Sequence, residues 1–273
     1  QFKMATTIAR YGLSGKRIGD GIGSHLSSGV GPVDDAPTRH PIHYQSRRTK
    51  QHRQRVGDRL PSLCLVLKLM IRNVILDWSG TLANDLAAVL EATNLIFTEY
   101  GRDPLSLEDF RTHFRLPFSG FYADLLPEAE AEGLEALYER FFLGLNDKVD
   151  LLPGALDFLI FCRNTGRRTF LLSTIKTSHF ERQAQRLGVM EYFEVPYTEI
   201  MDKREKIREI LKTHDLNPNE TMFVGDMIHD IETARHGGVL DVAVLTGFDT
   251  IEKLLPSKPT IIAVDIASIQ KML

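Results

Sequence analysis

From residue 70 onward, short apolar runs alternate with longer segments whose apolar residues recur at helical spacing. The runs are bounded by Gly, Asn, Asp or Ser, which is typical of buried strands. They predict strands at residues 74–76, 169–172, 193–195, 222–224, 242–245 and 261–264. The segments between most of them predict helices over 153–166, 178–187, 203–214 and 230–236. This alternation predicts an α/β fold, a doubly wound parallel sheet covered by helices on both faces.

Residues 85–149 lack strand patterns and predict a helical insert between the first two strands. We expect Asn84 to cap a long first helix that ends near Gly101. Ser106 begins a capping-box pattern for a helix to Phe114. A short helix over 118–126 and a long one over 127–149 complete the insert. The predicted α/β core is therefore formed by residues 70–84 and 150–273.

Before Leu63, the chain shows neither helical nor alternating periodicity. Residues 1–69 are therefore predicted to form a disordered basic extension. They hold 12 Lys and Arg against 4 Asp and no Glu, which gives +8 and leaves −11 for the remainder of a chain of net charge −3. An organellar transit peptide, a basic nucleic-acid-binding arm and translated upstream sequence without function are the three alternatives. Met70 would make a natural start directly before the first strand.

Composition indicates an ordinary globular protein, with 43% hydrophobic and 25% charged residues. The two cysteines, Cys64 and Cys162, do not suggest a disulfide framework, so we expect a reducing, cytoplasmic location. No apolar run reaches transmembrane length. We expect neither a membrane nor a nucleic acid as a partner, and the sequence does not determine the oligomeric state.

Three aspartates carry the candidate chemistry. Asp77 ends the first strand, Asp226 ends the strand at 222–224, and Asp230 follows four residues later. Carboxyl ends of parallel strands meet at the edge where α/β proteins bind ligands. Two strand-end carboxylates with a third nearby predict a site for a hard cation.

Four separated pieces together resemble the haloacid dehalogenase superfamily of hydrolases and phosphotransferases. They are residues 77–82 (Asp-Trp-Ser-Gly-Thr-Leu), the strand-end Ser173, a lysine before the next helix, and residues 225–230 (Gly-Asp-Met-Ile-His-Asp). The resemblance covers Met70 to the C-terminus and implies that residues 85–149 form a small helical cap. It implies a phosphoglycolate-phosphatase-like hydrolase of a small phosphorylated metabolite, without fixing the substrate.

The resemblance also implies residue roles. Asp77 would be the nucleophile that forms an aspartyl-phosphate. The Mg²⁺ site would consist of Asp77, Asp226 and the backbone carbonyl of Ser79, which share the ion, with Asp230 orienting metal-bound water or the Asp226 loop. Asp230 could equally be a plain helix N-cap, and both roles can hold together. Gly80 would let the backbone approach the phosphate, and Thr81 would support that loop.

For the phosphate itself, the resemblance implies Ser173, with Thr174 as its neighbouring alternative, as hydroxyl donors. Lys203 would neutralise the transferring phosphoryl group, and Lys206 competes for this role.

Ser79 departs from the motif of the phosphatases that the chain resembles. These phosphatases have Asp-x-Asp at this point and use the second aspartate as general acid and base. Serine cannot replace that acid, whose help is typically worth ~10²–10⁴-fold. The protein could be a slower phosphatase, with His229 as a speculative proton donor. It could resemble phosphonoacetaldehyde hydrolase, although residues 85–147 hold no lysine for its Schiff base. Resemblance to Asp-x-Thr pumps is weakened by the lack of membrane spans. A catalytically weak metal- and phosphate-binding module is the remaining alternative.

The substrate is expected to be recognised by residues 111–122. Arg115 could pair with a substrate carboxylate or second phosphate, and Ser119 is a second candidate contact. The segment also holds Arg111, His113, Phe118 and Tyr122, with Pro117 and Gly120 shaping a turn.

Overall fold

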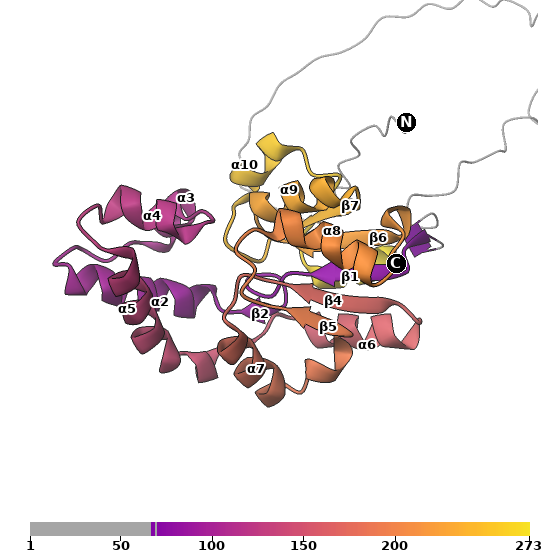
Figure 1. Cartoon of the computed structure of the whole chain (residues 1–273), viewed down its shortest axis with the longest axis horizontal. Coiled ribbons are helices and arrows are strands. Elements are labelled where there is room, and N and C mark those ends of the chain that lie inside the picture. Colours follow the sequence, from indigo (N-terminus) through magenta and orange to yellow (C-terminus); the bar gives the residue numbers. More distant parts are fainter. Residues whose placement is uncertain (1–66, 69) are drawn as a thin grey trace, which may run out of the picture. The chain divides into compact units, whose positions relative to one another are not determined.

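The computed structural model describes residues 67, 68 and 70–273, which are the coloured part of the chain in Figure 1. The predictions made for residues 1–66 and 69, including the disordered extension and its possible functions, lie outside the described residues. Within the described part of the chain, no helix is both long enough and apolar enough to cross a bilayer.

The centre of the fold is a six-stranded parallel sheet in the order β5-β4-β1-β6-β7-β8 (Figure 1). The strands are β1 (Asn73–Leu76), β4 (Arg168–Leu172), β5 (Val195–Tyr197), β6 (Thr221–Gly225), β7 (Leu240–Val244) and β8 (Ile261–Ala263). The predicted doubly wound α/β fold is confirmed. The predicted strand 193–195 lies two residues too early, because β5 pairs with β4 through Val195 to Tyr197.

Alternating side chains of each strand face two helical layers. Val74 and Leu76 belong to one buried cluster with residues of α6, α7 and α11, whereas Ile75 belongs to a second cluster with residues of α8 and α9. The helices are α6 (Ala155–Asn164), α7 (Thr177–Arg186), α8 (Lys203–Thr213), α9 (Ile228–Gly237), α10 (Ile251–Leu254) and α11 (Ile266–Met272). Both faces of the sheet are therefore buried, as a parallel sheet requires.

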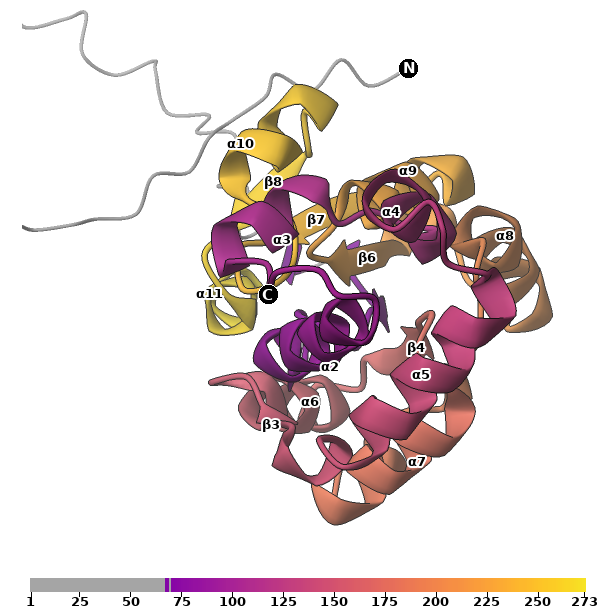
Figure 2. The same ribbon diagram turned by 90° about the vertical axis from the view of Figure 1, so that its left-hand side faces the viewer.

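The insert contains α2 (Leu86–Glu99), α3 (Leu107–His113), α4 (Phe118–Leu125), α5 (Ala131–Leu143) and the 3-10 helix η1 (Asn146–Lys148). Its helices lie beyond the end of the sheet at which β1 ends (Figures 1 and 2). Ser106 caps α3 as predicted, with its side chain accepting from the Asp109 amide. The long helix predicted over 127–149 is shorter: α5 begins at Ala131 and ends at Leu143, and the separate 3-10 helix η1 follows it.

Two short strands join the insert to the core. β2 (Ala83–Asn84) pairs antiparallel with β3 (Asp150–Leu151). The prediction that Asn84 caps α2 is wrong, because the pairing keeps Asn84 extended and the helix begins one residue later, at the N-cap Asp85.

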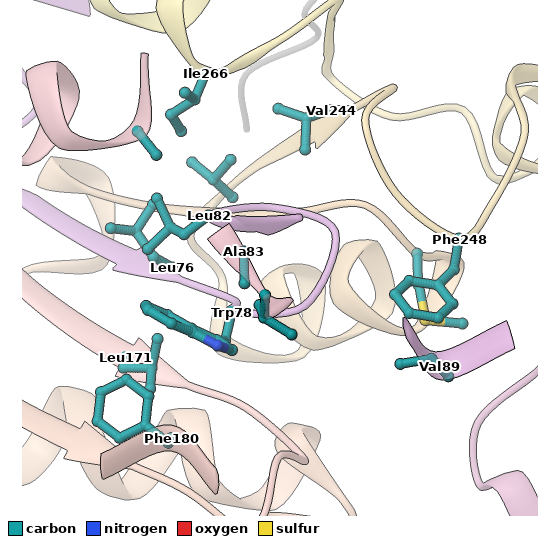
Figure 3. Packing of buried hydrophobic residues seen from close by; sticks show 14 of the residues in the cluster. Leu76, Trp78, Leu82, Ala83, Val89, Leu171, Phe180, Val244, Phe248 and Ile266 are labelled. Atoms are coloured by element: carbon teal, nitrogen blue, oxygen red, sulfur yellow. The ribbon is translucent and has the colours of Figure 1, made fainter. Parts of the chain in front are cut away.

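The residue after Asp77 anchors the loop that follows β1 in the core. Trp78 is fully buried, its indole N–H donates to Gln183 Oε1 at 2.6 Å, and its ring meets Phe180 edge to face (Figure 3). A buried indole needs such an acceptor. The apolar side of the loop is thus fixed against α7, while Asp77 remains at the strand end.

Candidate active site

The carboxyl ends of three neighbouring strands bring the predicted polar residues together. Since β1 lies between β4 and β6, Asp77 after β1 sits between Ser173 after β4 and Asp226 after β6. The Asp77 amide continues the pairing by donating to Val224 O at 2.9 Å. Backbone pairing of the sheet therefore places side chains that are up to 149 positions apart in the sequence at one edge.

Asp77, Asp226 and Asp230 converge there. Each offers a carboxylate oxygen, these oxygens lie within 4.8 Å of one another, and all three residues are buried. Asp226 accepts from the Thr81 hydroxyl at 3.1 Å and from the Phe248 amide at 2.7 Å. The second oxygen of Asp230 accepts from the Met227 amide at 3.0 Å. The carboxylates are thus held in place by neighbours from different elements.

Lys203 completes the cluster from the first residue of α8. Its ammonium lies 2.9 Å from Asp77 Oδ1 and 2.8 Å from Asp230 Oδ1, and the residue is fully buried. Lys206 instead pairs with Glu209 on the same helix. Of the two lysines considered from the sequence, the fold brings only Lys203 to the aspartates.

The cluster holds three buried carboxyl groups and one ammonium group. Burial raises the pKa of Asp77, against the opposing effect of Lys203, and burial raises the pKa of Asp226 well above its usual range. Burial acts to lower the pKa of Lys203, but Asp230 and Asp77 outweigh it and raise that pKa. Because one ammonium faces three buried carboxylates, the residues fit a site for an additional cation.

The oxygen atoms available at this site also fit a bound cation. Although Asp77 Oδ1 is close to Lys203, it makes no well-oriented hydrogen bond within the described part of the chain. Oxygen ligands in this number are typical of hard divalent ions.

Two glycines permit the close approach of these carboxylates. Gly80 has a φ of +71°, and a Cβ at this position would lie 2.7 Å from Asp226 Oδ2. At Gly225, a Cβ would lie 2.3 Å from the Asp230 side chain. Any larger residue would displace a carboxylate. The Gly80 amide donates to Ala83 O at 3.0 Å and to Asp85 Oδ1 at 3.2 Å, so it is engaged within its own loop.

A further buried carboxylate, Asp85, was not singled out from the sequence. It lies beside Ser79 and Asp77 at the wall of one cavity. Burial raises the pKa of Asp85 to about 7, against the opposing hydrogen bond from the Ser79 hydroxyl. Asn84 and Asp85 are both common cap residues, and nothing in the local pattern tells which of them is buried. His229, the speculative proton donor, does not line this cavity.

The two candidate phosphate-binding hydroxyls are placed differently. Ser173 is buried, and its Oγ accepts from the Ile175 amide at 3.4 Å. Thr174 is half-buried and lines the cavity beside Asp77. Both therefore lie at the edge that the sequence predicts, with Thr174 the more accessible.

The cavity has a volume of about 160 Å³ and reaches from Asp77 and Ser79 into the insert. One side is formed by six residues that we call the apolar wall: Phe114, Leu116, Phe118, Tyr122, Leu134 and Tyr138. Arg115 and Ser119, the predicted substrate contacts, are exposed and do not line the cavity. The Arg115 guanidinium instead pairs with Asp124 and donates to Gly120 O at 3.0 Å.

Known proteins resemble this chain in sequence. Residues 74–244 match the family model described as haloacid dehalogenase-like hydrolase. The chain is 29% identical to a phosphoglycolate phosphatase of Synechococcus elongatus over 199 residues, covering 68% of this chain and 89% of the relative. It is 26% identical to a 5'-nucleotidase of Pseudomonas aeruginosa over 214 residues, covering 74% and 95%.

The fold agrees as well. A haloacid dehalogenase-like family hydrolase from Streptococcus pneumoniae superposes with a TM-score of 0.67 at 22% identity, covering 74% of this chain and 97% of that structure. The family match spans more than half of the chain and includes both strand-end aspartates. The chain therefore belongs to the haloacid dehalogenase-like hydrolase family, and is an enzyme of that family.

Proposed function

We propose that this enzyme hydrolyses a small phosphomonoester through an aspartyl-phosphate at Asp77. The observation that carries the proposal is the convergence of Asp226, Asp230 and Lys203 on Asp77, which itself lines a cavity. Two relatives are named as phosphatases of small phosphorylated compounds, phosphoglycolate and 5'-nucleotides, which supports this reaction class. The insert would act as a cap that shields the site from bulk water.

The reaction has two steps. A carboxylate oxygen of Asp77 attacks phosphorus, the ester P–O bond breaks, and the alcohol oxygen leaves and takes up a proton. A water oxygen then attacks phosphorus, gives up a proton, and the bond between phosphorus and Asp77 breaks to release phosphate. The carboxylate of Asp77 is regenerated, so no other reactant is consumed.

The surrounding residues have distinct roles in this proposal. Lys203 neutralises negative charge on the transferring group. The hydroxyls of Ser173 and Thr174 donate to phosphoryl oxygens. Mg²⁺ would be held by Asp77, Asp226, Asp230 and the carbonyl of Ser79, and would reduce the repulsion between the anionic nucleophile and the anionic substrate.

Because residue 79 is a serine, the site has no carboxylic acid at this position. General acid–base help typically contributes about 10²–10⁴-fold, so we expect slow turnover of esters with poor leaving groups. Esters with an acidic alcohol such as p-nitrophenol need less protonation as they leave. They are therefore suitable first probes of the reaction.

The alternative C–P hydrolysis requires an amine that forms a Schiff base. Lys176 lines the cavity, but its ammonium is paired with Glu139 and Glu135 at 2.9 and 3.1 Å, and Glu139 in particular raises its pKa. A protonated amine is not a nucleophile. We therefore expect no borohydride trapping of phosphonoacetaldehyde on the protein.

The proposal is tested by measuring phosphate release from p-nitrophenyl phosphate with Mg²⁺ or EDTA, together with acid-quench trapping of ³²P-labelled protein. We expect Mg²⁺-dependent turnover and a hydroxylamine-sensitive label on Asp77. Asp77→Asn should lose both, whereas Asp103→Asn, a change of an exposed carboxylate in the insert, should keep both. If Asp77→Asn retains turnover, the proposal is wrong.

A further inference from the structure

Residues 111–122 contain both apolar and basic side chains, and of these two kinds only apolar ones line the cavity. Within residues 111–122, the side chains that line the cavity are Phe114, Leu116, Phe118 and Tyr122. The cationic side chains of the same segment are bound elsewhere: Arg111 donates to Gly247 O, Arg115 pairs with Asp124, and His113 contacts Asp109 O. The segment therefore presents its apolar face, and not its positive charges, to the cavity.

The charged side chains that line the cavity do not favour the binding of an anion. Lys176 is the one lysine or arginine among the residues that line it, and it lies between Glu135 and Glu139. His179, also at the wall, faces Glu139 with Nε2 at 3.3 Å from the carboxylate. Asp85 adds a further carboxyl group beside Ser79. A substrate carboxylate placed here would lose water and meet no unpaired cation, which is unfavourable.

The size of the cavity limits the apolar group that can enter. Its volume of about 160 Å³, which includes the end at Asp77 and Ser79, is close to the ~150 Å³ of an engineered apolar cavity that accepts one benzene molecule, so an apolar group that enters beside a phosphate is at most about one ring. Aromatic and leucine side chains on the wall gain contact with such a group without needing to rearrange polar partners.

Building on the proposed function, we propose that the substrate is a phosphomonoester whose alcohol carries an uncharged apolar group of about one ring, and not a carboxylate. The phosphate lies at Asp77, and the apolar group lies against the apolar wall. Recognition thus depends on shape and apolar contact at one end and on charge at the other.

The test compares esters of similar leaving-group acidity: benzyl phosphate, ethyl phosphate and phosphoglycolate, each with Mg²⁺. We expect kcat/KM for benzyl phosphate to exceed that for phosphoglycolate by at least about 10-fold, within the range that apolar pockets achieve. An equal or higher value for phosphoglycolate, or for phosphoethanolamine as a cationic ester, overturns the inference.

Binding of non-hydrolysable analogues separates this inference from the proposed reaction. Benzylphosphonate should raise the thermal midpoint of the Mg²⁺-loaded protein more than phosphonoacetate does. If it does so while every ester remains intact, the proposed hydrolysis fails but the preference of the cavity stands. If hydrolysis occurs and phosphonoacetate binds more tightly, the reaction stands and the substrate inference is overturned.

A charge introduced on the wall provides the matched variant. Leu116→Lys should shift the kcat/KM ratio toward phosphoglycolate by about 10-fold or more, because it supplies the missing cation. Leu107→Lys adds the same charge at an exposed leucine of α3 outside the cavity and should leave the ratio unchanged. Phe118→Ala, at an exposed rim position, should lower kcat/KM for benzyl phosphate several-fold and leave that for ethyl phosphate nearly unchanged. A ratio that is insensitive to Leu116→Lys and Phe118→Ala contradicts the placement of the substrate.

Discussion

The two ends of the cavity differ in almost every physical respect. At the sheet edge, Asp77, Asp226, Asp230 and Lys203 form a buried charged cluster in which each group is held by short polar contacts. At the insert, the apolar wall is built from aromatic and leucine side chains, several of them half-exposed. Charge dominates one end and apolar contact the other.

This contrast suggests a division of roles. The charged cluster depends on distances of about 3 Å that the end of β1 and the first turns of α8 and α9 fix, so small displacements there should change the chemistry strongly. The apolar wall depends on non-directional contact, so substitutions there should change which ester binds more than whether the reaction occurs. The following predictions test this division.

The largest effect is expected at Lys203. Lys203→Met should reduce kcat by about 10²–10³-fold, because the transferring phosphoryl group loses its positive partner. Measured in EDTA, it should also lower the free energy of unfolding by about 3–5 kcal/mol, since Asp77 and Asp230 remain buried without their ammonium. Denaturant unfolding and steady-state kinetics measure the two effects. Lys206→Met, on the same helix, serves as the control, and equal losses in both variants would contradict the assignment.

A gain of activity is expected at Ser79, where the charged cluster meets the cavity. If the native rate is low only because Ser79 cannot act as a general acid and base, Ser79→Asp should raise kcat for benzyl phosphate by at least about 10-fold. Ser79→Asn has a similar size without the acid and should not. Absence of a gain in Ser79→Asp would show that the native reaction uses different proton chemistry.

A smaller effect is expected on stability when the metal is added. Mg²⁺ at roughly 100-fold above its Kd should stabilise the folded protein by about 2–3 kcal/mol, because the ion offsets the excess of buried carboxylate. Asp226→Asn should remove this response, and Asp103→Asn should retain it. Unfolding midpoints with Mg²⁺ and with EDTA provide the measurement, and a full Mg²⁺ response in Asp226→Asn would exclude the proposed ligand set.

The smallest effect is expected at Arg115, the substrate contact predicted from the sequence. Because its guanidinium is exposed and pairs with Asp124, Arg115→Ala should change kcat/KM for phosphoglycolate and for benzyl phosphate by less than about twofold. A selective loss with phosphoglycolate would restore the sequence prediction and contradict the apolar preference of the cavity.

The sequence alone predicted the fold class, which the structure confirms, and the strand-end residues that we propose as the reaction centre. Asp77 and Asp226 are recognisable because each follows a short apolar run that is typical of a buried strand, and strand ends of a parallel sheet meet at one edge. Lys203 could be preferred over Lys206, since it stands at the start of a helical segment, but the choice required the fold. The structure made it by burying Lys203 between two carboxylates.

Tertiary structure decided the features that depend on which face of a helix or loop is covered. Asn84 and Asp85 have similar cap propensities, and only the pairing of β2 with β3 placed the Asp85 carboxyl in the cavity. Within residues 111–122, arginines and aromatic residues are interleaved, so the sequence could not show which set faces the substrate. The arginines face away from the cavity because Arg111 binds Gly247 O and Arg115 binds Asp124. Gly247 is distant in the sequence and Asp124 lies in the next helix, so only the folded chain brings these partners together.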